Sequence, residues 1–114
     1  MSHRLDNYLR TYRKRAGLSQ DEVAFLLGSR SGAKVSRYEL FRRLPTLETA
    51  LALEAIFGVP VRELFAGLHE RGTRAVASRA RVLLQRLAAE APAPGASQKL
   101  ASLRALILQR AKDR

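Results

Sequence analysis

The segment Ser19–Glu39, with the sequence SQDEVAFLLGSRSGAKVSRYE, decides how this chain folds. It opens with Ser19 and has Glu22 three residues later, which is the pattern of a capping box at the start of a helix. Gly28 follows the apolar part of the segment and is the residue expected to end that helix. The pattern therefore predicts a short helix whose apolar side consists of Val23, Leu26 and Leu27.

A second short helix is expected in the other half of the same segment. Residues 29–31 form a polar gap, after which a helix is expected over Gly32–Leu40. Val35 and Tyr38 lie three residues apart and are expected to face the core, whereas Arg37 is expected to face outward. Two short helices separated by a tight polar turn are typical of a helix-turn-helix. In that motif the first helix crosses the phosphate backbone, and the second enters the major groove.

Short helical patterns flank this segment on both sides. Residues 4–15 have apolar side chains at helical spacing, and Gly17 is expected to close that helix. Downstream, Thr46 is the expected N-cap and Gly58 the expected C-cap of a fourth helix. Its inner face is predicted to consist of Leu47, Ala50, Leu51, Leu53, Ile56 and Phe57. With a further short helix over 61–66, residues 1–68 are expected to form a compact bundle of five helices.

Residues 69–114 differ from the preceding part in charge and in apolar spacing. They carry ten basic and three acidic side chains, a net charge of +7 against +4 for residues 1–68. A helix over 73–90 is expected, then a break at Ala91-Pro92-Ala93-Pro94-Gly95 and a last helix capped by Ser97. The expected inner faces consist of Val76, Ala80, Leu83 and Leu87, and of Leu100, Leu103, Leu106 and Ile107. We therefore predict an all-α protein with a bundle over 1–68 and a basic helical hairpin over 69–114.

The composition indicates a polyanionic partner. The 114 residues carry a net charge of +11, and 17 of the 21 basic side chains are arginine. Arginine matches phosphate oxygens and base edges better than lysine does, because its planar group offers several donors in a fixed fork. An arginine- and alanine-rich composition also arises from the base usage of a genome, so the charge alone leaves that alternative open.

No metal, cofactor, catalytic or membrane site is expected. The chain has no cysteine, and His3 and His69 lie far apart without a carboxylate pattern around them. No nucleophile–base pair or paired carboxylates are visible. The longest apolar run, Val23–Leu27, has five residues, and the first fifteen residues contain no apolar stretch of an export signal. These features predict a cytoplasmic protein that is not an enzyme.

Three strings resemble one known family. They are GLSQDEVAFLLG at Gly17–Gly28, VSRYE at Val35–Glu39 and PTLETALALEAIFGVPVRELF at Pro45–Phe65. Together they are similar to the Cro/phage-repressor-type helix-turn-helix regulators, the XRE family, over about residues 5–66. The resemblance implies a lambda-repressor-like bundle of five helices. It also implies a sequence-specific, double-stranded-DNA-binding transcriptional regulator of the repressor type, which inserts the Gly32–Leu40 helix in the major groove.

The resemblance also implies roles for individual residues. Gln20 corresponds to a residue that binds a backbone phosphate and braces a neighbouring reader. Gly32, Ala33 and Arg37 correspond to positions that face base edges. The remaining DNA-binding candidates are Arg30 and Ser31 in the turn, Lys34 and Ser36 within the helix, and Arg42 and Arg43 in the loop after it. Arg13 and Glu39 correspond to a buried or half-buried ion pair that ties the first helix to the third.

Three departures from the family pattern concern site specificity. The interval from Gly28 to Val35 is one residue longer than is usual, so the turn is enlarged. Gly32 and Ala33 replace residues with hydrogen-bonding side chains. Leu40-Phe41 stands where a polar residue and glycine usually follow the glutamate, which leaves open that the helix runs on.

The hairpin leaves the partners of the chain open. A homodimer through residues 73–110 is the expectation we favour, because two half-sites multiply affinity and read a palindrome. One alternative is an antitoxin-type protein whose C-terminal helices bind a small protein partner, which would then co-purify. Another is a nonspecific architectural DNA-binding protein, which scrambled competitor DNA would distinguish from a regulator.

Overall fold

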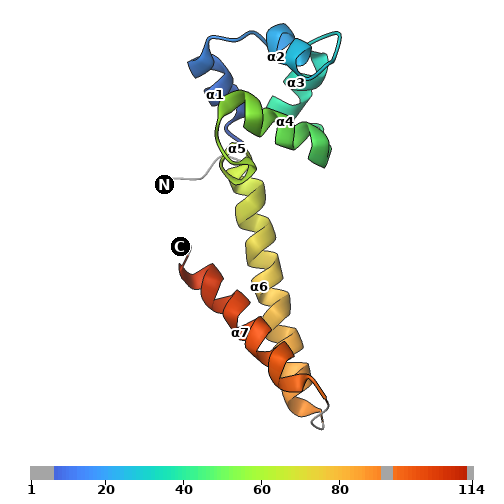
Figure 1. The fold of residues 1–114 in the computed structure, drawn as a ribbon, viewed down its shortest axis with the longest axis vertical. Coiled ribbons are helices and arrows are strands. Elements are labelled where there is room, and N and C mark those ends of the chain that lie inside the picture. The colour runs from blue at the N-terminus through green and yellow to red at the C-terminus, as the bar shows by residue number, and fades with distance from the viewer. Residues whose placement is uncertain (1–6, 91–93, 113–114) are drawn as a thin grey trace. The chain divides into compact units, whose positions relative to one another are not determined.

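The structure, a computed structural model, describes residues 7–90 and 94–112, and it contains seven helices and no strand within them (Figure 1). The expected all-α fold is therefore confirmed. The helices are α1 (Leu9–Ala16), α2 (Gln20–Leu26), α3 (Ala33–Glu39), α4 (Leu47–Phe57), α5 (Val61–Leu64), α6 (Ala66–Ala89) and α7 (Ala96–Lys112). The chain divides into two compact units, Met1–His69 and Glu70–Arg114. None of the described helices is long and apolar enough to cross a membrane.

The core of the first unit is shared by its five short helices. Each of α1 to α5 contributes at least one side chain that solvent does not reach, and these are Leu9, Val23, Ala24, Val35, Leu53 and Leu64. Tyr38 and Phe65 complete the buried cluster. Full burial of one such aliphatic side chain stabilises a fold by about 1.5–3 kcal/mol. The five helices therefore form one cooperative bundle, as expected.

Helix α1 begins later than predicted because the residues before it make tertiary hydrogen bonds. The Asn7 side-chain oxygen accepts from the Leu9 N–H at 3.2 Å, and its Nδ2 donates to the Tyr38 carbonyl at 3.1 Å. The Tyr8 N–H donates to the Leu64 carbonyl at 2.6 Å. Residues 7 and 8 were predicted to be helical and are not, so the prediction is wrong there. Residues 4–6 of the predicted helix lie outside the described part.

Three helices in the first unit end with the same pair of hydrogen bonds, the Schellman motif. Gly17 and Gly28 occupy the left-handed position after α1 and α2, with φ of 75° and 79°, so both predicted stops are confirmed. After α3 the same position is occupied by Phe41, with φ of 60°. The Phe41 N–H donates to the Tyr38 carbonyl, and the Arg42 N–H donates to the Arg37 carbonyl. Helix α3 therefore stops at Glu39 and does not run on.

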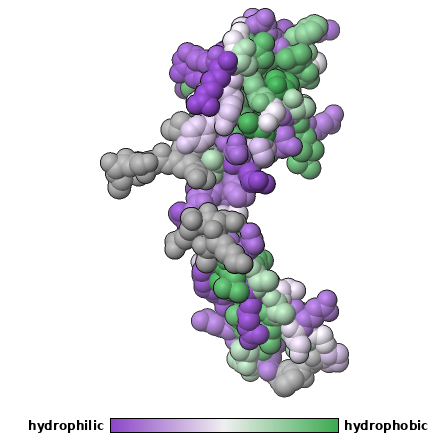
Figure 2. Space-filling model, turned by 60° about the vertical axis from the view of Figure 1, so that its left-hand side comes forward, coloured by the Kyte–Doolittle hydropathy of each residue, from purple (hydrophilic) through white to green (hydrophobic). Residues whose placement is uncertain are grey.

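Helix α4 has the predicted ends but only part of the predicted inner face. The Thr46 hydroxyl accepts from the Thr49 N–H at 3.2 Å, and Gly58 is left-handed, which confirms both caps. Leu47 and Leu51, however, are 76% and 52% exposed, so their assignment to the core is wrong. The helix is apolar on most of its circumference, so periodicity could not select the inner side. Hydrophobic side chains therefore remain at the surface of the first unit, and Figure 2 shows them beside hydrophilic ones. Leu26 of α2, also predicted inward, is exposed as well.

The second unit consists of most of α6, with α7 returning along it (Figure 1). Helix α6 begins at Ala66 instead of residue 73, because neither Gly67 nor Gly72 leaves helical geometry. The fifth helix ends at Leu64 and not at residue 66, because Phe65 leaves helical geometry, with φ of −118° and ψ of 52°.

The predicted seam of α6 is shifted. Ala77 and Ala80 are buried and Leu87 is half-buried, whereas Val76 and Leu83 are exposed. In α7, Leu100, Leu103 and Ile107 are half-buried as expected, whereas Leu106, also predicted inward, is exposed.

The turn between α6 and α7 is only partly described. Residues 91–93 of the predicted break lie outside the described residues, and Gly95 is left-handed with φ of 81°. Ser97 is the second residue of α7 and not its cap, so that prediction is wrong. Leu83, Leu87 and Leu103 line one shallow hollow where the two helices meet near this turn.

Candidate nucleic-acid interface

The start of α2 is built by its own side chains. The Ser19 hydroxyl accepts from the Glu22 N–H at 3.0 Å, and the Glu22 carboxylate accepts from the Ser19 N–H at 2.8 Å. This is the capping box that the sequence predicts. Val23 and Ala24 then bury the inner side of α2 against the bundle.

The start of α3 is held by α2. The Asp21 carboxylate accepts a hydrogen bond of 2.7 Å from the N–H of Gly32, the N-cap of α3, which has no side chain of its own to cap the helix. Gly32 is buried, and a Cβ atom there would lie 2.8 Å from the backbone carbon of Gln20. Gly32 therefore offers little surface to a base edge, and its expected reading role stays a prediction. Only a glycine lets the two helices approach this closely.

The end of α3 is held by a charged cluster. Arg13 Nε donates to Glu39 Oε2 at 2.5 Å, and Arg13 Nη2 donates to Glu39 Oε1 at 3.2 Å. The side chains are only 11% and 3% exposed. The hydrogen bond to Glu39 raises the pKa of Arg13 above its usual value, burial opposes this, and the charge of Glu39 adds to it. The ion pair implied by the resemblance is therefore confirmed.

Gln20 belongs to the same cluster. Its Nε2 donates to Glu39 Oε1 at 3.1 Å, and the side chain is half-buried. Gln20 thus braces Glu39, which is not one of the expected reading residues, and its expected roles at a phosphate and beside a reader stay predictions. Asn7 adds a further restraint, because its Nδ2 donates to the carbonyl of Tyr38 beside Glu39.

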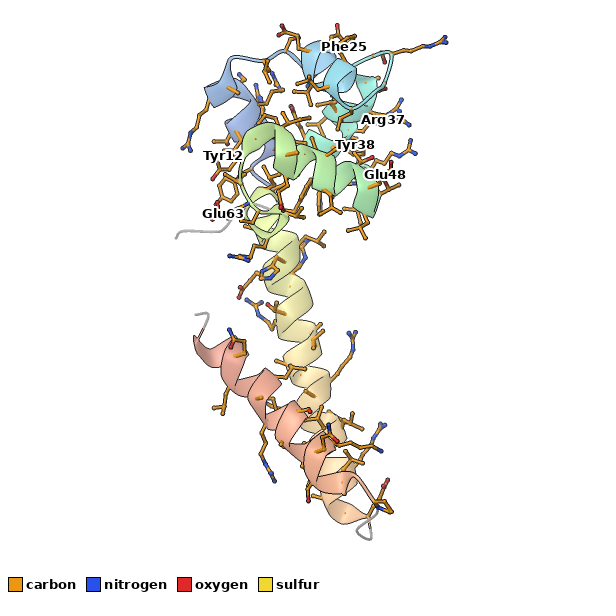
Figure 3. The ribbon with its side chains drawn as sticks, viewed as in Figure 1. Tyr12, Phe25, Arg37, Tyr38, Glu48 and Glu63 are labelled. Carbon is orange, nitrogen blue, oxygen red and sulfur yellow. The ribbon has the colours of Figure 1, made fainter. Side chains whose placement is uncertain are left out.

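The outward side of α3 is left accessible by these restraints. Val35 and Tyr38 are buried, whereas Ala33, Lys34 and Arg37 are exposed and Ser36 is half-buried. Figure 3 shows Arg37 extending from α3 away from the bundle. The helix thus has an apolar back and a small, polar or basic front, as a helix that enters the major groove requires.

The turn and the loop on either side of α3 add further cations. Arg30 and Ser31 are exposed in the turn, and the Ser31 hydroxyl accepts from the Ala33 N–H at 3.3 Å. Arg42 and Arg43 are exposed directly after α3. Within the described part of the chain, the cations that make no ion pair here are Arg30, Lys34, Arg37, Arg42 and Arg43. The α2–α3 region therefore offers uncompensated positive charge.

Fold and surface together define a helix-turn-helix domain. The sequence model of the helix-turn-helix domain family matches residues 5–66, more than half of the chain, and the chain belongs to this family. Family membership indicates a DNA-binding regulator. Comparisons with curated proteins and with solved structures return no match.

Sequence reasoning missed Asp21, Asn7 and Phe41 as residues that position α3. The bare Gly32 at a helix start was the one signal that a cap from elsewhere was needed. Nothing in the sequence identified Asp21 as the residue that supplies it. Phe41 was noted only as a departure from glycine, and its left-handed conformation is a property of the folded chain.

Proposed function

We propose that the chain is a sequence-specific transcriptional regulator of the Cro/phage-repressor (XRE) type, and that it represses by occluding a promoter. The observation that carries the proposal is the restraint of α3 at both ends, by Asp21 at Gly32 and by Arg13 at Glu39, with its outward side exposed. A rigid helix with a free front side reads base edges without paying a large ordering cost on binding.

The residue roles follow from position and chemistry. Arg37 forms a bidentate pair with the O6 and N7 of a guanine, and Ala33 lies against a thymine methyl. Lys34 and Ser36 contact bases or phosphates beside them. Phosphate contacts come from Gln20, Arg30, Ser31, Arg42 and Arg43, which set the position of the helix but not its specificity.

We assign DNA binding to residues 1–68 and self-association to the extension over 69–114. Val76 and Leu108 are exposed apolar side chains of the extension and support its pairing with a second copy. A symmetric dimer then binds two half-sites about 34 Å apart, or a multiple of that distance.

Selection of bound duplexes from a random pool, followed by sequencing, tests this function. A recovered palindrome is expected. Arg37→Ala is expected to lose about 1–3 kcal/mol of binding free energy on the selected duplex. It is also expected to relax the discrimination between bases at one base pair. Arg42→Ala is expected to weaken all duplexes alike and to reduce the salt dependence. Arg62→Ala, an exposed arginine of α5, serves as the charge-matched control. Equal losses for Arg37→Ala on selected and scrambled duplexes contradict the base-reading role.

One observation favours a nonspecific DNA-binding protein as the second candidate. Ala33 offers no hydrogen-bonding side chain and Gly32 is buried, so two of the expected reading positions contribute little to discrimination between bases. In that case the random pool returns no consensus, and scrambled DNA competes as well as any selected duplex.

A further inference from the structure

The solvent side of α6 carries a stripe of small and weakly polar residues at heptad spacing. The stripe consists of Ala75, Ser78, Val82, Gln85 and Ala89, at successive intervals of three and four. Ala77 and Ala80, which are buried, lie on the opposite side of the helix. Val82, in the middle of the stripe, is 48% exposed. A shallow groove over this side is lined by Ser78, Arg79, Val82, Leu83 and Arg86.

Four arginines border the stripe, two along each edge. Arg74 and Arg81 lie along one edge and Arg79 and Arg86 along the other, each pair seven residues, or about 10.5 Å, apart. Arg74 makes an exposed ion pair with Glu70, whose N–O distance is 3.2 Å. For the other three arginines, no carboxylate among the described side chains lies within ion-pair distance.

We propose that this arginine-bordered stripe docks an acidic amphipathic helix of another protein. The bordering positions correspond to e and g of a heptad, which pair with charges on the facing helix and select the partner. All four are positive here, so a partner with glutamate or aspartate at its own e and g positions forms four favourable pairs. Its a and d side chains then cover Val82 and the groove around it.

A second copy of this chain is a poor occupant of the stripe. Pairing two copies of α6 through this side places like charges opposite each other along both edges, which is destabilising. Self-association of the extension must therefore use apolar side chains outside this groove, such as Val76 and Leu108. The two interactions are thus compatible on one hairpin.

A nucleic-acid backbone is also less well matched than a helix. Phosphate contacts require cations, but they do not require an apolar floor between them. The exposed Val82 and the groove beside it supply such a floor, and the seven-residue spacing of the arginines repeats the heptad of a helix. Removing the apolar surface of Val82 and the groove from water lowers the free energy of binding, and only an apolar partner surface provides this.

Binding of two synthetic peptides to the full chain tests the proposal. One is a three-heptad peptide with leucine at a and d and glutamate at e and g; the other has lysine at e and g. Fluorescence anisotropy at low ionic strength is expected to give at least tenfold tighter binding of the glutamate peptide. Absence of binding by the glutamate peptide overturns the proposal.

Paired variants separate docking from net charge. Arg79→Glu/Arg86→Glu is expected to weaken binding of the glutamate peptide at least tenfold and to allow binding of the lysine peptide. Lys99→Glu/Arg104→Glu changes the net charge equally at exposed positions of α7 and is expected to change binding by less than threefold. Equal effects of the two double variants overturn the proposal. Circular dichroism confirms that each variant keeps its helices.

Val82→Arg distinguishes a docked helix from a phosphate backbone. The variant adds positive charge but removes the apolar floor, so the glutamate peptide is expected to bind at least fivefold more weakly. A random-sequence DNA duplex is expected to bind equally well or more tightly. Unchanged or tighter peptide binding overturns the proposal. If Arg79→Glu/Arg86→Glu weakens duplex binding tenfold while the control pair does not, the stripe is a DNA contact instead.

Discussion

The Asp21 carboxylate on α2 lies 2.7 Å from the backbone nitrogen of Gly32, at the point where α3 begins. A residue of the first helix of the motif thus accepts from the N–H of Gly32, which is the N-cap of the second helix and has no side chain to cap it. This hydrogen bond ties the end of the turn, at the start of α3, back to α2. The front side of α3 is therefore positioned by α2 as well as by the core.

Removal of this cap is expected to weaken folding and DNA binding together. Asp21→Ala should lower the free energy of unfolding by about 0.5–2 kcal/mol, the usual effect of losing an N-cap. Asp21→Asn keeps an oxygen acceptor and should recover most of that loss. Urea unfolding and duplex binding measure both variants. Equal destabilisation by alanine and asparagine would show that the hydrogen bond is not the cause.

Substitution of Gly32 is expected to destabilise the fold because a Cβ atom there clashes with α2, and not because the backbone requires a glycine conformation. Gly32→Ala places a Cβ atom 2.8 Å from the backbone carbon of Gln20, which cannot rotate away, and should cost about 1–3 kcal/mol of stability.

Gly72 provides the control for this substitution. It is exposed within α6, and a Cβ there meets nothing within 4 Å. Gly72→Ala should therefore stabilise the chain by about 0.5–1 kcal/mol. Opposite signs for the two glycine-to-alanine changes in thermal unfolding are the expected result. A neutral Gly32→Ala contradicts the close approach of α2 and α3.

Loss of the carboxylate at Glu39 is expected to be among the most damaging single changes in the first unit. Glu39→Gln leaves the Arg13 guanidinium charged and mostly shielded from water, at a cost on the order of 3 kcal/mol. The double variant Arg13→Met/Glu39→Gln should be less destabilised than the sum of the two single changes. Additive losses in urea unfolding would show that the two side chains do not interact.

The pH dependence of this stabilisation follows from the direction of the Arg13 shift. Because the pKa of Arg13 is raised in the folded chain, the stabilisation is complete below the unfolded pKa and is lost only as pH rises through the folded one. Both values lie far above neutrality. The stability difference between Arg13→Met and the unmodified chain should therefore stay constant from neutral to moderately alkaline pH. Urea unfolding over that range measures it, and a decline there contradicts the assignment.

The left-handed backbone at Phe41 is expected to reverse the usual order of glycine and alanine. Phe41→Gly and Phe41→Ala both lose the half-buried ring that packs against the core. Glycine, however, adopts φ of 60° without the cost of about 1–2 kcal/mol that a side chain incurs there. Phe41→Gly should thus unfold at a higher temperature than Phe41→Ala. Ala101→Gly, at an exposed position within α7, should be destabilising and serves as the control.

Local patterns predicted the helices of the first unit and most of their ends. The capping box at Ser19, the cap at Thr46 and the stops at Gly17, Gly28 and Gly58 are each made by atoms a few residues apart. Such hydrogen bonds depend on residue type and spacing, so a sequence contains them directly. The same holds for the buried pair in α3 and for the exposure of Arg37, which follow from a helical repeat.

What the sequence determined by itself is therefore the all-α class, the helix-turn-helix segment and the polar front of α3. The tertiary structure alone decided which side of α4 is buried, where α1 begins and where α3 stops. It also placed Gly32 in close contact with Gln20 and made Asp21 its hydrogen-bond partner. The physical reason is range: these features depend on contacts between residues far apart in the chain, which for the stop of α3 means the packing of Phe41 against the core, and no local spacing encodes them.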